Sequence, residues 1–338
     1  MTVDEKIPIW LDCDPGNDDV FAILLASLHP SFKILGISTV HGNVSLDHTT
    51  HNALAVLQMF GFKQDEIKVY RGSNEPLVVP NRFATNVHGR AGIGGIDVLK
   101  ETILTESTDM SYLKAIREAI LDNENKICIA CTGPLTNLSK LLSAYPELKS
   151  KIRYITIMGG AINLGNITPY SEFNFYGDPQ AAHNIVTDEE VCGKVFLAPL
   201  NLTHQAVADD KVMNEIYNKD HNTELRKNLN SILAFFGEVY KSRGFSGAPI
   251  HDPVAIYALI PLINRNKRNT CFRYLRRKLD VILEGKREGE SIIINDTYDK
   301  SLEEANGTYV GTEIDIKNFW ADVSEAIKNA EKNILRAE

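Results

Sequence analysis

The sequence is best approached from the stretch Trp10-Leu11-Asp12-Cys13-Asp14-Pro15-Gly16-Asn17-Asp18-Asp19, in which four carboxylates fall within eight residues. An apolar run at residues 7–11 leads into the stretch, and a second apolar run at residues 20–26 follows it. This pattern predicts a strand, a tight turn at Pro15-Gly16 and then a helix.

The four carboxylates of this turn need separate explanations. Asn17 or Asp18 can cap the helix, and acidic residues at a helix start favour its positive dipole end. That accounts for Asp18 and Asp19 but leaves Asp12 and Asp14 without a role. Like charges in one turn repel one another unless a cation neutralises them. The sequence therefore predicts a divalent-metal site, in preference to a capped and solvated turn.

Short apolar runs alternate with helical patterns along the rest of the chain. They predict strands at residues 32–40, 67–70, 127–131, 152–158, 195–200, 279–283 and 309–316, and a closing helix at about residues 318–330. Such alternation is typical of an α/β protein with an open, largely parallel sheet and helices on both faces. No linker or repeat interrupts the pattern, so we expect a single domain over residues 1–338.

Polar residues follow several of these strands at the point where each strand ends. Besides the acidic turn, they are Gly42-Asn43, Thr132-Gly133, Gly159-Gly160 and Asn201. In an open α/β sheet the carboxyl ends of the strands border the crevice in which ligands bind. We therefore expect these residues to face one pocket.

The composition argues against several classes of protein. A net charge of −8 disfavours a general nucleic-acid binder, and acidic residues frame the basic stretch Arg265–Lys278, which favours a solvated face. No apolar run reaches the roughly 18 residues of a membrane span, and we expect no secretory signal, because residues 1–6 show no apolar h-region. The pair Cys128 and Cys131 lies in an apolar run, which favours reduced, buried thiols over a zinc or redox site. We expect a cytoplasmic protein.

The segment Val87–Gly95 is dense in glycine and contains His88. It lacks the Lys-Ser/Thr ending of a P-loop, and no strand precedes it, as a dinucleotide fingerprint requires. A mobile loop over a ligand cleft is the better interpretation. His88 is then a candidate for contacting substrate when the loop closes.

Two metal motifs fit the acidic turn incompletely. An EF-hand loop that starts at Asp12 needs an oxygen ligand at its fifth position, where this chain has Gly16. A phosphotransferase of the haloacid-dehalogenase type would use Asp12 as nucleophile and Asp14 as acid/base, with magnesium. That hypothesis gives Asp18 and Asp19 no ready place.

The whole octet Asp12–Asp19 resembles the DxDPGxDD signature of the inosine–uridine-preferring nucleoside hydrolase family. Further short segments resemble that family's motifs in the family's order: Gly42-Asn43, Val87–Gly89, Thr132–Asn137, Met158–Gly160, Gly165-Asn166, Glu172–Asn174 and His251–Pro253. The resemblance implies a Rossmann-like α/β fold with a mixed sheet. It also implies bound calcium and cleavage of the N-ribosidic bond of nucleosides to ribose and free base.

The resemblance further implies a metal site and a catalytic base. Ca²⁺ would be held by Asp14, Asp19, Asp252 and the backbone carbonyl of Thr132, which are hard oxygen donors that suit calcium better than zinc. Asp14 would also act as general base on the metal-bound water. Asp12 would support its neighbours from behind.

Other motif residues would bind the substrate. The ribose would lie against Asp18, Asn43, Met158, Asn166, Glu172 and Asn174. His251, next to a metal ligand, would act as an acid or hydrogen-bond donor near the departing base. Apart from the resemblance, Phe236 and Tyr240 stand at i, i+4 on one helix face, which fits either core packing or contact with the base.

These assignments predict a calcium-dependent ribonucleoside hydrolase, with uridine, inosine and cytidine as first candidate substrates. The resemblance also implies a homodimer or a homotetramer. Two alternatives stay open, namely the magnesium phosphotransferase and a ribose-binding protein without turnover.

Overall fold

The computed structural model describes residues 6–96, 101–263, 272–294 and 307–337. Within them, the main sheet has the strand order β3-β2-β1-β4-β5-β6-β12-β9. Neighbouring strands are parallel, except that β9 is antiparallel to β12. The bounds are β1 Ile7–Cys13, β2 Phe32–Thr39, β3 Val69–Arg71, β4 Cys128–Cys131, β5 Tyr154–Met158, β6 Val195–Ala198, β9 Phe272–Arg277 and β12 Thr308–Ile314. The expected mostly parallel, mixed sheet is confirmed.

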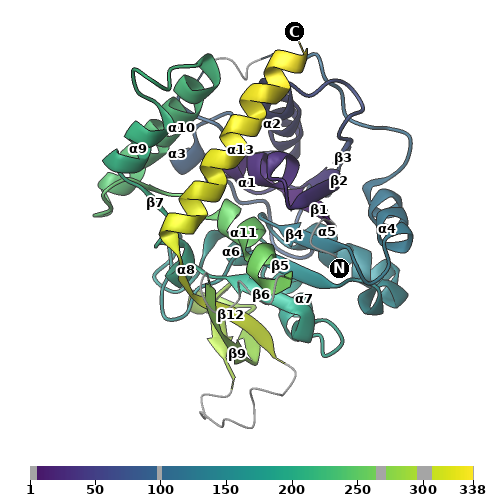
Figure 1. Cartoon of the computed structure of the whole chain (residues 1–338). Helices are drawn as coiled ribbons and strands as arrows, with labels where there is room; N and C mark the ends of the chain where they lie inside the picture. The colour runs from purple at the N-terminus through teal and green to yellow at the C-terminus, as the bar shows by residue number, and fades with distance from the viewer. Residues whose placement is uncertain (1–5, 97–100, 264–271, 295–306, 338) are drawn as a thin grey trace.

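Helices cover both faces of this sheet (Figure 1). Side chains alternate along β1, so that Ile9 and Leu11 enter one hydrophobic cluster and Trp10 enters the other. The first cluster is completed by α1 (Asp19–Leu28), α2 (Leu46–Met59), α9 (Asp210–Ile216), α10 (Glu224–Lys241), α11 (Asp252–Ile263) and α13 (Ile316–Ala337). The second is completed by α4 (Tyr112–Asp122), α5 (Thr136–Ala144) and α7 (Pro179–Val186).

Short elements lie around the main sheet. They are α3 (Thr85–His88), α6 (Phe173–Gly177), α8 (Leu200–Thr203) and the antiparallel pairs β7 (Val207–Ala208) with β8 (Ala248–Pro249) and β10 (Leu279–Val281) with β11 (Ser291–Ile293). The strand predicted at residues 279–283 is therefore real but belongs to a separate two-stranded ribbon. The sequence patterns did not predict α11 or β9.

The basic stretch Arg265–Lys278 lies partly outside the described residues. Its described part forms β9 at the edge of the main sheet. There Arg273 is exposed and pairs with Glu313, while the guanidinium of Arg276 lies 3.8 Å from the ring centre of Tyr309. These side chains are engaged with the protein's own groups.

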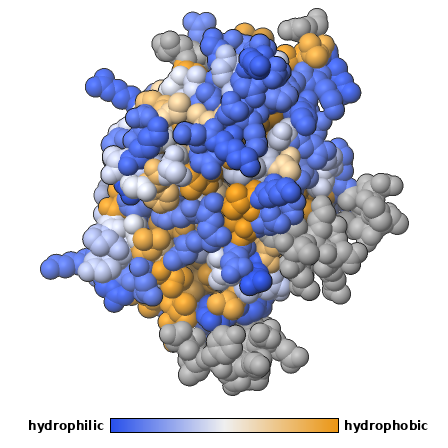
Figure 2. Space-filling model, turned by 60° about the vertical axis from the view of Figure 1, so that its left-hand side comes forward, coloured by the Kyte–Doolittle hydropathy of each residue, from blue (hydrophilic) through white to orange (hydrophobic). Residues whose placement is uncertain are grey.

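The face of the molecule in Figure 2 carries mostly hydrophilic side chains in its upper half, with smaller hydrophobic patches lower down. Among the described residues, we find no helix with the length and apolar character needed to cross a membrane.

Candidate active site

A pocket opens where the carboxyl ends of the central strands meet. The acidic turn follows β1, Asn43 follows β2, Thr132 follows β4 and Met158 ends β5. All four segments contribute residues to the lining of one pocket. Asn201 is an exception, because its side chain pairs with the backbone of Ile162 instead of facing the pocket.

The floor of this pocket is a cluster of buried carboxylates. Asp18 and Asp252 line the pocket, whereas Asp14 and Asp19 lie beneath it and are fully buried. Carboxylate oxygens of Asp18, Asp19 and Asp252 lie within 4.8 Å of one another. The structure thus brings the first helix of the chain together with the start of α11, more than two hundred residues later.

Burial raises the pKa of every carboxyl group in the floor. It raises the pKa of Asp18 to about 7, helped by the charge of Asp19, and the pKa of Asp19 to about 6. Burial and the charges of neighbouring floor carboxylates raise the pKa values of Asp14 and Asp252 well above the usual range. A bound cation would favour the charged forms and relieve this repulsion.

The donors of the floor fit a hard divalent cation. They are carboxylate oxygens, with the Thr132 segment beside them, and calcium prefers such oxygen ligands. Oδ1 of Asp14 is buried and has no hydrogen-bond partner among the described residues, so it is available as a ligand or base. Asp18, expected to hold ribose, stands in the same cluster as Asp19 and Asp252 and also borders the pocket.

Hydrogen bonds fold the acidic turn around these groups. The Gly16 N–H donates to Asp19 Oδ2 (2.8 Å), and the Thr132 hydroxyl donates to Asp19 Oδ1 (2.8 Å). The Asn43 N–H donates to Asp14 Oδ2 (2.7 Å). Both oxygens of Asp19 and one oxygen of Asp14 are therefore oriented, although no basic side chain takes part in these contacts.

The expected helix cap is wrong. Asp18 occupies the N-cap position of α1, but its carboxylate makes no capping bond and instead accepts the His251 N–H at 3.2 Å. The side-chain amide of Asn17 donates to the carbonyl of Gly94 at 3.2 Å. The acids at this helix start serve the pocket rather than the helix end.

Asp12 lies behind the floor and does not line the pocket. Its carboxylate accepts hydrogen bonds from the Ser38 hydroxyl and from the Asn137 amide, the latter at 2.8 Å. Burial raises its pKa to about 7. A side chain held in this way is poorly placed as the nucleophile of a phosphotransferase.

One wall of the pocket is polar. It is lined by Asn43, Met158, Asn166, Glu172 and Asn174. The Glu172 carboxylate accepts the backbone N–H groups of Gly160 (2.9 Å), Asn174 (2.8 Å) and Phe175 (3.1 Å), which fixes it at the start of α6. The Asn174 amide donates to the Thr132 carbonyl at 2.8 Å, so this predicted metal ligand already carries one hydrogen bond. Oδ1 of Asn166 has no hydrogen-bond partner among the described residues.

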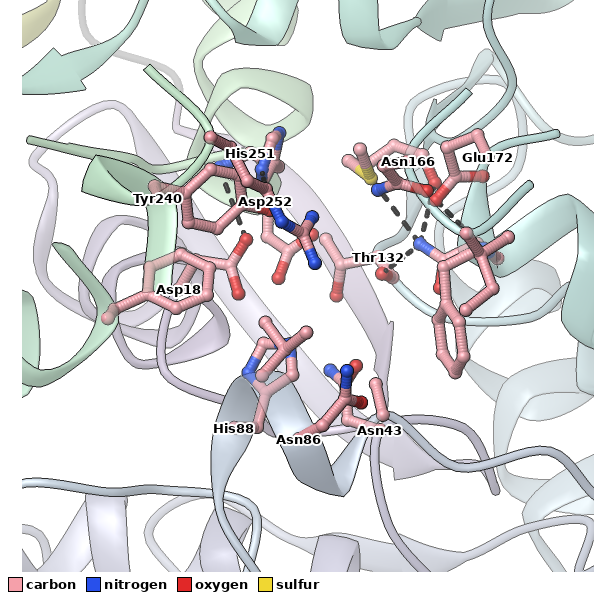
Figure 3. Close-up of a pocket in the computed structure, with 18 residues that line it drawn as sticks. Asp18, Asn43, Asn86, His88, Thr132, Asn166, Glu172, Tyr240, His251 and Asp252 are labelled. Carbon is pink, nitrogen blue, oxygen red and sulfur yellow. Dashed lines mark hydrogen bonds between the residues drawn. The ribbon is translucent and has the colours of Figure 1, made fainter. Parts of the chain in front are cut away.

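The aromatic wall contains Phe236, Tyr240, His251 and His88. Figure 3 shows Tyr240 and His251 across the pocket from Asn166 and Glu172. Rings of His88 and Phe236 lie 5.2 Å apart, and those of Phe236 and Tyr240 lie 4.9 Å apart. Burial, helped by nearby His204, His88 and Arg243, lowers the pKa of His251 well below its usual range. The imidazole of His251 is therefore neutral at neutral pH.

The glycine-rich segment forms the rim beside this aromatic wall. His88 ends the short helix α3, and its Nδ1 accepts the Asn17 N–H at 3.1 Å. Because Nδ1 is the acceptor, the ring proton of neutral His88 sits on Nε2, and burial lowers its pKa to about 3. The side-chain amide of Asn52 holds the carbonyl of Ala91 at 2.8 Å, which ties the segment to α2.

Six residues that line the pocket were not among the predicted site residues, although Val87 and Phe173 lie within the motifs named above. The six are Ala84, Asn86, Val87, Ile167, Phe173 and Arg243. Arg243 continues the helical face of Phe236 and Tyr240 by three residues, and its guanidinium carbon lies 5.2 Å from the Tyr240 ring centre. Extending that helical stripe would have found it.

Comparison with known proteins agrees with this geometry. The chain matches the model of the inosine-uridine preferring nucleoside hydrolase family over residues 9–321. It is 41% identical to the uridine nucleosidase of Saccharomyces cerevisiae, with 98% of each chain covered. It is 34% identical to the pyrimidine-specific ribonucleoside hydrolase RihA of Escherichia coli, with 95% of this chain and 98% of that protein covered.

Solved structures of similar fold include a purine-preferring ribonucleoside hydrolase from Gardnerella vaginalis, with a TM-score of 0.82 and 25% identity over 97% of this chain and 99% of that one. A plant nucleoside hydrolase, PpNRh1, has a TM-score of 0.81 and 25% identity over 96% of this chain and 99% of that one. These matches set aside the phosphotransferase and the ribose-binding protein without turnover. The chain is an enzyme, and it belongs to the inosine-uridine preferring nucleoside hydrolase family.

Proposed function

We propose that this enzyme hydrolyses the N-glycosidic bond of ribonucleosides with bound Ca²⁺, that uridine is its preferred substrate, and that inosine and cytidine are also cleaved. The observation that carries the proposal is the floor of buried carboxylates beneath a pocket with one polar and one aromatic wall. The names of the uridine and pyrimidine-specific relatives, at 41% and 34% identity, support the order of substrates.

Asp14 is the proposed general base, with Asp14, Asp19, Asp252 and the Thr132 carbonyl as the proposed calcium ligands. A bound Ca²⁺ would lower the pKa of a water molecule and hold it for attack on the anomeric carbon. Asn43 fixes one oxygen of the Asp14 carboxylate and leaves Oδ1 free to accept a proton. The carboxylate floor also stabilises the positive charge that develops on the sugar as the C–N bond breaks.

The polar wall is the proposed ribose site. Asp18, Asn43, Asn166, Glu172 and Asn174, together with the Met158 backbone, offer carboxylate and amide groups for the sugar hydroxyls. Glu172 is held by three backbone N–H groups, so it can accept from a hydroxyl without reorganising.

The aromatic wall is the proposed base site, with Phe236 and His88 packing against the base. As the C–N bond breaks, its electron pair goes to the base nitrogen, which leaves more readily if a proton or a hydrogen bond reaches the base. His251 and Tyr240 are the proposed donors, because both line the pocket and are hydrogen-bonded to each other.

The test is the release of free ribose from uridine, inosine and cytidine, measured as reducing sugar with and without a calcium chelator. We expect ribose from uridine first, loss of activity with chelator, and recovery on addition of Ca²⁺. Absence of ribose from all three substrates at micromolar enzyme would contradict the proposal. Full activity in chelator, or recovery with magnesium alone, would contradict the calcium assignment.

We also propose that the enzyme is a homodimer or a homotetramer, as the resemblance to the family implies. Light scattering coupled to size-exclusion chromatography tests this directly. A mass near the 37.7 kDa of one chain at micromolar concentration would contradict it.

A further inference from the structure

A second cluster of metal-ligating side chains lies where the end of α1 meets α13. His29 follows the last residue of α1, and Asp322 and Glu325 stand three residues apart on one face of α13. One ligand atom from each of the three lies within 4.8 Å of the others. The two helices pack against each other, with α13 crossing α1 in Figure 1. The cluster is at the opposite end of α1 from Asp18 and Asp19, about 15 Å along the helix.

The His29 side chain is buried but incompletely satisfied. It is only 4% exposed, and its Nε2 has no hydrogen-bond partner among the described residues. Nε2 lies 3.6 Å from Oδ1 of Asp322, which is within ion-pair range but too long for a hydrogen bond. Buried polar atoms are normally paired. A nitrogen and a carboxylate oxygen held apart at this distance can instead both bind a third group, such as a metal ion, that lies beside them.

We propose that His29, Asp322 and Glu325 form a binding site for a divalent transition-metal ion, with Zn²⁺ as the probe. One imidazole nitrogen and two carboxylate oxygens suit zinc and its first-row neighbours, whereas calcium prefers oxygen ligands alone. This donor set differs from the all-oxygen floor of the pocket, so the two sites select different ions.

Closure of the site requires two adjustments. Zinc–ligand distances are about 2.0–2.2 Å, so the ligand atoms must draw closer than they stand now. Glu325 is exposed on the surface of α13 and is free to turn inward. Nδ1 of His29 now accepts the Ser31 N–H at 3.3 Å, and a metal on Nε2 exchanges that long hydrogen bond for a proton on Nδ1. Both changes are local.

A bound ion would join the end of α1 to α13 beside an existing link. The side-chain amide of Asn329 donates to the carbonyl of Leu28 at 3.1 Å, one turn away from Glu325 along α13. The ion binds the folded arrangement and not the separated helices, so it should raise the melting temperature.

The experiment is calorimetric titration of Zn²⁺ into the full-length enzyme, kept saturated with Ca²⁺ so that the carboxylate floor is occupied. We expect the wild type to bind one equivalent of Zn²⁺. The variants His29→Gln and Glu325→Gln should not bind this equivalent. His183→Gln is the matched control, because His183 forms a histidine–aspartate pair with Asp280 (2.7 Å) that has no third ligand grouped with it in the described part of the chain. The His183→Gln variant should still bind one equivalent of Zn²⁺.

Glu325→Gln guards against a folding defect, since this side chain is exposed and its loss leaves the core intact. Zn²⁺ should raise the melting temperature of the wild type and of His183→Gln, but not that of the two site variants. Absence of a zinc equivalent in the wild type, or the same equivalent in all four proteins, would overturn the proposal.

Discussion

The hydroxyl of Tyr240 lies 2.9 Å from Nε2 of His251, and the hydroxyl of Thr203 lies 2.8 Å from Nδ1 of the same ring. Both ring nitrogens of His251 are therefore engaged by hydroxyl groups. Burial keeps the imidazole neutral and raises the pKa of the Tyr240 phenol above its usual value. The three side chains form a line of exchangeable protons that ends at the aromatic wall of the pocket.

This line predicts that Tyr240→Phe will slow the cleavage of uridine by about 10²–10⁴-fold in kcat, the usual contribution of acid–base assistance. A nitrophenyl riboside should lose much less, because its leaving group departs without a proton. His251→Ala should follow the same pattern. Steady-state kinetics on both substrates check this, with Tyr170→Phe at the surface as control. Equal losses on the two substrates would argue against leaving-group assistance.

Two glycines leave the space that the Asp14 carboxylate occupies. A Cβ atom at Gly133 would lie 2.6 Å from Asp14 Oδ1, and one at Gly42 would overlap Oδ2. Gly133→Ala and Gly42→Ala should therefore displace the proposed base and reduce kcat by about 10²-fold, the effect of a misplacement near 1 Å. Gly193→Ala is the matched control, since the nearest atom to its Cβ would be 3.8 Å away. Normal rates in both site variants would remove Asp14 from its role.

Calcium removal should make stability depend on pH. Without metal, the pKa values of Asp18 and Asp19 are raised to about 7 and about 6, so the folded state binds more protons than the unfolded chain. The stabilisation that these two groups contribute to the metal-free enzyme is then fully present below about pH 4 and is lost as pH rises through 6 and 7. Melting temperatures measured in chelator should fall from pH 5 to pH 8. Saturating calcium should flatten this dependence, and an equally steep fall with calcium would contradict the metal site.

Substitutions at Asn166 and Asn174 should differ in their effects, the first on activity alone and the second on both activity and thermal stability. Oδ1 of Asn166 has no partner among the described residues, so Asn166→Ala should reduce kcat/KM for uridine by about tenfold or more and leave the melting temperature unchanged. Asn174 donates to the carbonyls of Thr132 and Met158, so Asn174→Ala should lower both activity and melting temperature. Kinetics and thermal unfolding on the two variants check this. Identical behaviour of the pair would contradict the distinction.

Local patterns were sufficient for the strand, turn and helix around the acidic stretch, and for most of the strands that follow along the chain. The turn at Pro15-Gly16 and the apolar runs beside it carry their own signals. Strand ends in a parallel sheet meet at one edge, so Asn43 and Thr132 could be placed near the turn before any contact was known.

Two elements lacked such signals. Helix α11 is buried on all sides, so its sequence shows no contrast between polar and apolar faces. Pro261 inside it also argues against a helix. Strand β9 is rich in arginine, and its pairing with residues of β12, more than thirty positions later in the chain, defines it as a strand. Periodicity within a short window cannot detect either feature.

The pocket residues that were missed depend on tertiary contact. Asn86 comes from the short helix α3 and Ile167 from a loop, the two meet only on folding, and neither belongs to a motif with a chemical signature. The relation of Asp18 to Asp252 is likewise invisible in a local pattern. It needs the start of α11 to lie against the acidic turn.

The buried carboxylate floor also bears on which form of a nucleoside enters the pocket. If a divalent cation keeps all four floor carboxylates ionised, the floor still carries a net negative charge, and charge repulsion in a desolvated site is strong. A 5′-phosphate would bring further negative charge toward this floor. We therefore expect nucleotides to be poorer substrates than the corresponding nucleosides, and comparing ribose release from uridine with that from its 5′-monophosphate checks this.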